Sequence, residues 1–229
     1  AQQAGPCRSR TGRGVAMSEL SFSVLDLFAE PYAVAPQLTA RLRITESTGE
    51  VIHAIALRAQ VRIEPQRRQY SGEEERGLLD LFGARERWYD TLKPFLWMQT
   101  GTMVQGFTGA AEVNLALPCT YDFDVTASKY LHALRDGAVS VVLLFSGTVF
   151  TRGQRGFGVE QVPWDREARF DLPVAVWREL IDHYYPNSGW LRLDRGLLDR
   201  LAAFKAERGF TTWDETLGTL LADMDRSLP

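Results

Sequence analysis

The residues best suited to acid and base chemistry lie in the stretch YDFDV. Asp122 and Asp124 are two positions apart, so we expect both carboxylates on one face of a strand. Tyr121, Phe123 and Val125 then occupy the other face. Paired carboxylates in this arrangement can bind a hard divalent cation or share the roles of general acid and general base. The solvated face of an ordinary antiparallel strand has the same pattern, and we favour that interpretation.

His132 is the third weak catalytic candidate beside this pair. The histidines His53, His132 and His183 are isolated, without an H-x-x-x-H, H-E-x-x-H or C-x-x-C partner. We therefore predict no metal site and no cofactor. There is also no G-x-S-x-G nucleophile elbow. An enzyme with a dispersed site that uses Asp122, Asp124 and His132 with a divalent cation remains the alternative.

The segment GQRGFG places three glycines directly after an apolar run. A phosphate-binding loop needs G-x-x-x-x-G-K-[ST], or G-x-G-x-x-G opening a helix, and neither pattern is present. The sequence that follows, VEQV, alternates as a strand does. We therefore predict a hairpin turn between strands that end near Phe150 and begin near Phe157, with Arg152 and Arg155 at its tip.

Aromatic residues beside turns are the candidate binding residues. They are Trp164, Tyr184, Tyr185 and Trp190, with Arg192 close to the last. Such side chains anchor protein interfaces, because they bury a large area at low entropic cost. They are also common where a helix packs on a sheet, so core and interface both remain open. A pocket for a small molecule, lined by Trp164 and Trp190, is a further alternative.

Composition narrows the classes of partner. The 229 residues include 26 Lys and Arg against 29 Asp and Glu, a net charge of −3, which predicts no binding to nucleic acid. The apolar run from Ala138 to Phe145 is far shorter than a membrane-spanning helix, so we predict no membrane insertion. With residues 1–16 set aside, Cys119 is the one cysteine, and the cytoplasm is the default location. The sequence does not indicate an oligomeric state.

The first two thirds of the chain read as mainly β-structure. Residues 38–44 and 56–64 alternate apolar and polar side chains around a turn, which predicts one long hairpin. Residues 73–82 form a short predicted helix with Ser71 as its cap, and Pro94 should end any helical continuation. A second short helix is predicted over 128–137.

Several apolar elements follow. The segment from Ala138 to Phe150 is apolar on both faces and predicts a central strand. Residues 173–185, 194–209 and 211–225 predict three helices. The fold class is therefore α+β: an antiparallel sheet or sandwich with short helical insertions, followed by about three C-terminal helices packed on it.

The domain organisation follows from the same pattern. We expect residues 1–16 to be a disordered or non-native extension, because the strand pattern begins just after Met17. Residues 17–229 then form a single compact domain, mainly β over 17–172 and mainly α over 173–229.

Several segments together carry a resemblance that spans nearly the whole chain from Met17 onward. They are IEPQRRQY, LLDLFG, PCTYDFDV, KYLHAL, LLFSGTVF, EQVPWD and YPNSGWLRL. The chain resembles a family of bacterial proteins of unknown function that occurs near genes for nickel–iron uptake hydrogenases and their maturation proteins. The resemblance implies an accessory or assembly role and supplies no catalytic residue. We therefore expect a non-catalytic cytosolic accessory protein that binds a protein partner, such as a hydrogenase subunit or maturation factor.

Overall fold

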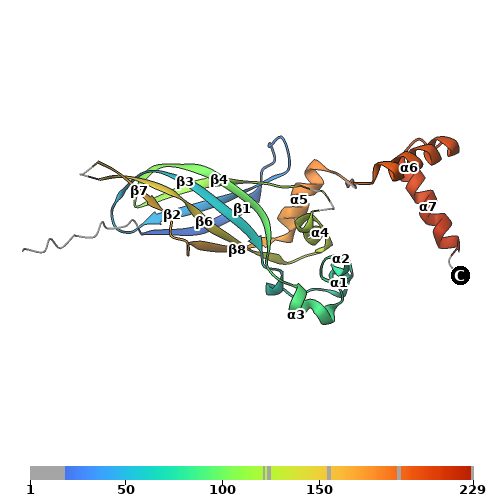
Figure 1. Cartoon of the computed structure of the whole chain (residues 1–229), viewed down its shortest axis with the longest axis horizontal. Helices are drawn as coiled ribbons and strands as arrows, with labels where there is room; N and C mark the ends of the chain where they lie inside the picture. Colours follow the sequence, from blue (N-terminus) through green and yellow to red (C-terminus); the bar gives the residue numbers. More distant parts are fainter. Residues whose placement is uncertain (1–18, 121, 123–124, 154–155, 190–191, 228–229) are drawn as a thin grey trace, which may run out of the picture.

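The computed structural model describes residues 19–120, 122, 125–153, 156–189 and 192–227. Within them the chain forms two antiparallel β-sheets, a group of short helices at one end of the sheets, and longer C-terminal helices (Figure 1). This confirms the predicted α+β class, a sandwich of antiparallel sheets with helical insertions and C-terminal helices.

The two sheets take their strands from separate parts of the chain. Among the described residues, the first sheet has the order β1 (Leu20–Ala29), β2 (Gln37–Glu46) and β5 (Ala110–Pro118). The second has β4 (Phe95–Thr108), β3 (Val51–Ile63) and β6 (Ala138–Gly153), and β6 also pairs with β7 (Gly156–Gln161) and β8 (Glu167–Pro173). The apolar faces of both sheets enclose one core.

The strands β2 and β3 lie in different sheets, so the expectation that residues 38–64 form one hairpin is wrong. β2 pairs with β1 and β5, whereas β3 pairs with β4 and β6. Alternation shows which face is buried, but it looks the same for paired strands and for strands that face each other across a core. The chain crosses between the sheets at residues 47–50, where the Glu46 carboxylate accepts hydrogen bonds from the backbone N–H groups of Thr48 (2.9 Å) and Gly49 (2.8 Å).

The strand β6 is the long central strand that the apolar run predicts. Val141 and Leu143 are fully buried, and Phe145 stacks on Phe22 of β1 with ring centroids 4.4 Å apart. This contact joins the two sheets through the core. β6 continues to Gly153, which pairs with Gly156 at the start of β7.

The predicted hairpin at GQRGFG is confirmed by this pairing. Residues 154 and 155, which include the predicted tip residue Arg155, lie outside the described residues, whereas Arg152 lies within β6 and pairs with Phe157. Since Gly153 ends β6 and Gly156 and Gly158 belong to β7, this segment leads into a strand and not into a helix N-terminus that could bind phosphate.

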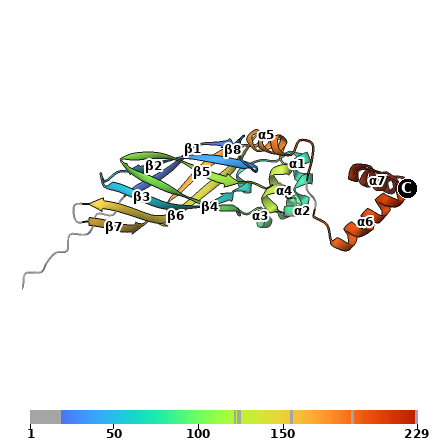
Figure 2. The ribbon, with the colours of Figure 1, turned by 90° about the horizontal axis from the view of Figure 1, so that it is seen from above.

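Short helices cover one end of the sandwich (Figure 2). They are η1 (Pro65–Arg67), α1 (Gly72–Gly77), α2 (Leu79–Phe82), η2 (Arg85–Arg87), α3 (Trp88–Thr91) and α4 (Thr126–Ala133). Ser71 caps α1 as predicted: its hydroxyl accepts the Glu74 backbone N–H (3.3 Å), and the Glu74 carboxylate accepts the Ser71 N–H (2.9 Å). Helical structure ends before Pro94, also as predicted.

The helix α4 ends at Ala133, four residues before the predicted end at Gly137. Leu134 adopts an extended conformation and is fully buried. The backbone N–H of Arg135 donates to the Glu74 carboxylate at 2.9 Å. Tertiary contacts therefore stop this helix earlier than the glycine signal would.

The C-terminal helices are α5 (Val174–Tyr184), α6 (Arg195–Arg208) and α7 (Trp213–Ser227). Helix α5 packs on β1, β8 and α4, and buries Trp177 and Leu180 in the core. Helices α6 and α7 contact each other and lie beyond the end of the sandwich in both ribbon views (Figures 1 and 2). The packing expected of all three helices is thus seen for α5.

Candidate functional site

The acidic pair is only partly described. Asp122 is half-buried in an isolated β-bridge, where its backbone N–H donates to the Thr120 hydroxyl oxygen (3.2 Å) and its carbonyl accepts from the Val125 N–H (3.0 Å). Asp124 lies outside the described residues. The prediction that both carboxylates share one strand face therefore stays a prediction.

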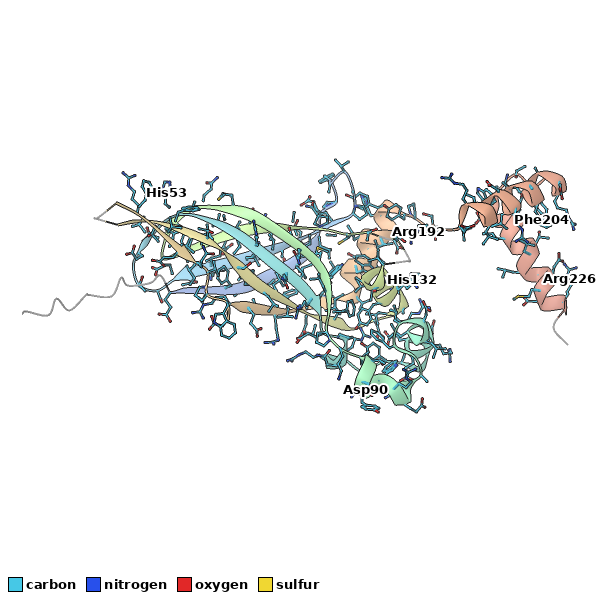
Figure 3. The ribbon with its side chains drawn as sticks, viewed as in Figure 1. His53, Asp90, His132, Arg192, Phe204 and Arg226 are labelled. Atoms are coloured by element: carbon cyan, nitrogen blue, oxygen red, sulfur yellow. The ribbon has the colours of Figure 1, made fainter. Side chains whose placement is uncertain are left out.

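His132 lies on α4 and lines a cavity of about 220 Å³ between α4 and α5 (Figure 3). Arg135, Arg178 and Asp182 also line it, and Asp122 does not. Arg178 donates to the Leu134 carbonyl (2.9 Å). Burial and the two guanidinium charges lower the pKa of His132, so the ring is held in its neutral form.

The cations of this cavity already have protein acceptors. Arg135 forms an ion pair with Glu73 at 2.7 Å, in addition to the hydrogen bond of Arg178. Across the described residues, no three side chains of His, Cys, Asp or Glu are grouped so that they could hold a metal ion. His132 therefore lines this cavity together with basic side chains and Asp182, and Asp122 is not among its lining residues.

Cys119 has the wrong environment for a nucleophile. Its thiol donates to the Leu117 carbonyl at 3.3 Å, and burial raises its pKa to about 12. The reactive form of a cysteine is the thiolate, so this side chain stays protonated and unreactive at neutral pH.

The aromatic candidates are separated by the structure. Trp164, in the turn between β7 and β8, is 94% exposed, so it does not line an enclosed pocket. Tyr184 and Tyr185 at the end of α5 pack partly buried against the core, and the Tyr184 hydroxyl approaches the carbonyls of Glu30 (3.1 Å) and Ala33 (2.7 Å). Tyr184 thus fastens α5 to the β1–β2 loop, while Tyr185 packs against the core.

The remaining two members of that candidate set lie past α5. Arg192 is exposed at the start of the segment that leads to α6 (Figure 3). Trp190 lies outside the described residues. Among the candidate binding residues that the structure describes, Trp164 is therefore the aromatic side chain that is almost fully exposed to solvent.

Besides Trp164, exposed apolar side chains lie on the outer face of the larger sheet, at the end opposite the short helices. Met103, Phe157 and Val159 are 62%, 67% and 63% exposed, and we call them the ribbon face. The register places them on one side of the sheet, because Val159 pairs with Phe150 and Phe150 with Ala54, two residues from the partner of Met103.

Charged and aromatic groups flank the ribbon face. The Arg152 guanidinium lies 5.8 Å from the centre of the Phe157 ring, and the His53 ring meets the same ring edge-on at 5.1 Å. On the other side of β7, a side chain at Gly158 would clash with the Thr151 hydroxyl. Phe157 and Val159 are thus held outward by a strand that fits closely against β6.

The strand β7 also leaves one backbone edge open. In the described part of the sheet it is the last strand after β4, β3 and β6. Its sequence, GFGVEQ, has neither the proline nor the lysine that commonly protects an edge strand. A free edge with exposed apolar side chains can receive a further strand from another protein.

Compared with known protein families, residues 17–228 match the model of a family of unknown function, DUF6084. The chain belongs to this family. No curated protein matches it.

Solved structures offer only distant likenesses to this DUF6084 chain. A β-glucosidase from Kluyveromyces marxianus is 8% identical with a TM-score of 0.25, over 67% of this chain and 15% of that one. β-Glucosidase 3B from Thermotoga neapolitana is 14% identical with a TM-score of 0.24, over 67% and 17%. AggA, the major fimbrial subunit from Escherichia coli, is 8% identical with a TM-score of 0.24, over 68% and 94%. Such scores carry no functional argument.

Sequence reasoning on the DUF6084 chain missed the ribbon face. The signal was present in FGVEQ, where apolar residues recur at every second position directly after a turn. Met103 could not have been added, because it comes from β4, about fifty residues earlier, and joins the surface through strand pairing alone. None of the helices in the described part of the chain has the length and apolar character needed to span a bilayer.

Proposed function

We propose that this protein is a non-catalytic accessory protein that binds a protein partner through the ribbon face and the open edge of β7. The observation that carries the proposal is the pair Phe157 and Val159, each more than 60% exposed on β7 at that edge, with the exposed Met103 farther across the same sheet face. Exposed apolar clusters of this kind are typical of protein-binding sites, because water is released from them on association.

The chemistry of the surface defines the partner. A strand added to β7 would satisfy its outward N–H and C=O groups and supply alternate apolar side chains over Phe157 and Val159. Arg152, which lies over Phe157, favours an acidic residue beside those apolar ones. Trp164 lies in the turn that follows β7 and is almost fully exposed.

The identity of the partner rests on the sequence resemblance alone. It suggests a hydrogenase subunit or a hydrogenase maturation factor, in a bacterial cytoplasm, and no bound cofactor is required. Assembly by surface contact needs no metal ligands in this chain, which agrees with the protonated state of Cys119 at neutral pH.

A charge placed on the ribbon face tests the proposal. We expect Val159→Lys to abolish recovery of the partner in a pull-down with the tagged full-length chain, because a desolvated charge would face an apolar strand. The matched control is Leu79→Lys, an equally exposed leucine on α2 at the other end of the molecule, which should recover the partner normally.

Two results would contradict the proposal. One is equal recovery of the same partner by wild type and Val159→Lys. The other is the absence of any stoichiometric partner when the chain is co-expressed with nickel–iron hydrogenase subunits and maturation factors.

A further inference from the structure

The helix pair formed by α6 and α7 carries apolar side chains that stay partly exposed to solvent in the described structure. On α7 they recur at the spacing of one helix face: Trp213, Leu217, Leu220, Leu221 and Met224. Leu221 and Met224 are 59% and 53% exposed. Helix α6 has a less regular apolar stripe, which Lys205 and Arg208 interrupt, and none of its residues is buried. The stripe consists of Leu197, Leu198, Leu201 and Phe204.

Contacts at the turn hold the two helices together without burying these stripes. The Lys205 ammonium donates to the Phe210 carbonyl (3.0 Å), and the rings of Phe204 and Phe210 lie 6.2 Å apart. Thr216 is the buried residue of the described pair. Helices of 14 and 15 residues have little stability without an apolar face packed on something else. The pair therefore needs a cover.

The two helices have opposite charge. Helix α6 has four basic and two acidic residues, a formal charge of +2: Arg195, Arg200, Lys205, Arg208, Asp199 and Glu207. Helix α7 has four acidic residues and one basic residue, a formal charge of −3: Asp214, Glu215, Asp223, Asp225 and Arg226. Each helix is thus complementary in charge to the other, and both have nearly the same length.

We propose that the cover is a second copy of this chain. Two helix pairs, related by a twofold axis, form a four-helix arrangement with the four apolar stripes inside. In a twofold interface every contact occurs twice, so α6 of each copy faces α7 of the other and both contacts join opposite charges. This surface is separate from the ribbon face, so the dimer presents two ribbon faces to other partners.

The first test measures the mass of the full-length chain in solution over a dilution series in the micromolar range. We expect a dimer for wild type. Leu221→Glu should raise the dimer dissociation constant by about a hundredfold or more, because each of the two equivalent leucines loses its burial and becomes a charge. The matched control is Ala222→Glu, the same new charge on the opposite side of α7, which should remain dimeric.

The second test uses charge reversal to show which helices face each other. Asp223→Lys with Asp225→Lys changes α7 from −3 to +1, and Arg195→Glu with Arg200→Glu changes α6 from +2 to −2. Each double variant alone should be monomeric, since its α6 and α7 then have the same sign. The two variants mixed should form a heterodimer, because both of its α6–α7 contacts join opposite charges again.

The outcomes decide the proposal in either direction. A wild-type chain that is monomeric throughout the series overturns it, whether or not the helix pair binds a different protein. A dimer that survives Leu221→Glu also overturns it, as does failure of the mixed variants to associate. Thermal unfolding of each variant checks that the body, which contains the whole described core, stays folded.

Discussion

Glu74 is the buried carboxylate on which the helical end of the molecule depends. It accepts hydrogen bonds from the backbone N–H groups of Ser71 and Arg135, both at 2.9 Å, and forms an ion pair with Arg68 at 2.7 Å. One side chain thus caps α1, holds the backbone at Arg135 just after α4, and pairs with a largely buried guanidinium. Sequence alone identifies the first of these roles, through the spacing of Ser71 and the acidic run.

Removing this carboxylate should destabilise the protein. We expect Glu74→Gln to lower the free energy of unfolding by about 3 kcal/mol. Arg68 loses its charged partner in a buried site, and the NH2 group of the new glutamine faces a backbone N–H group that it cannot accept a hydrogen bond from. Urea denaturation measures the loss. The control is Glu73→Gln, which alters an exposed ion pair with Arg135 and should change stability by less than about 1 kcal/mol. Equal losses for the two variants would contradict the role given to Glu74.

The same residue predicts a pH dependence. Burial tends to raise the pKa of Glu74, but the backbone hydrogen bonds from Arg135 and Ser71 and the charge of Arg68 outweigh it, and the pKa lies below its ordinary value of 4.5. As the pH falls through this range, Glu74 is protonated in the unfolded chain before it is protonated in the folded protein. The free energy of unfolding therefore declines below about pH 4.5. In Glu74→Gln this part of the decline should be missing when denaturation midpoints are compared across pH.

At the scale of elements, β3 and β6 meet more closely at Gly147 than a side chain would permit. Gly147 has φ +148°, and a Cβ there would lie 2.2 Å from the carbonyl oxygen of Ala56. This glycine lies in the middle of the central strand pair, where neither backbone can move without disturbing the core. The sequence FSGTVF gives no sign that its glycine differs from those at the hairpin.

Substitution of this glycine should weaken the sandwich. We expect Gly147→Ala to destabilise the protein by about 2 to 3 kcal/mol through steric strain between the paired strands. Gly218→Ala is the matched control, since a Cβ on that helical residue meets nothing within 4 Å. It should leave stability unchanged or raise it by up to about 1 kcal/mol. Thermal unfolding of the two variants side by side checks both expectations, and a stable Gly147→Ala protein would show that the strands can separate freely.

At the scale of the whole molecule, the chain divides into a body with a packed core and a helix pair beyond it. The body contains every residue of the core, from Leu20 to Ile181, whereas Thr216 is the buried residue of the described helix pair. Local stability follows the density of buried apolar contacts. The two parts should therefore open independently.

Hydrogen exchange tests this division. In the Leu221→Glu variant, we expect amides of α6 and α7 to exchange much faster than those of β3 and β6, because an uncovered helix pair opens without global unfolding. In wild type, self-association should slow exchange in α6 and α7 and leave β3 unchanged. Protection of α6 and α7 equal to that of β3 in the variant would mean that they belong to the same cooperative unit as the body.

Much of the local structure could be predicted because its causes are local. The cap at Ser71, the stop at Pro94, the hairpin at GQRGFG and the helices from Pro173 onward depend on backbone preferences within a few residues. The candidate site was predicted less well. Trp164 is displayed as an interface residue would be, while Tyr184 and Tyr185 fasten α5 to the body, and the same aromatic chemistry suits both roles.

The sequence by itself determined which faces are apolar and where most helices lie, although tertiary contacts moved the end of α4. Its charge and motifs also led us to expect neither nucleic-acid binding nor a known catalytic site. Tertiary structure alone decided that β2 and β3 belong to different sheets and that Met103 shares a sheet face with Phe157 and Val159, across β3 and β6. It also decided that the stripes of α6 and α7 are left without a cover. The physical reason is that the spacing of apolar residues shows only that one face of an element must be buried or bound. Which other element covers that face is set by pairing between residues far apart in the chain.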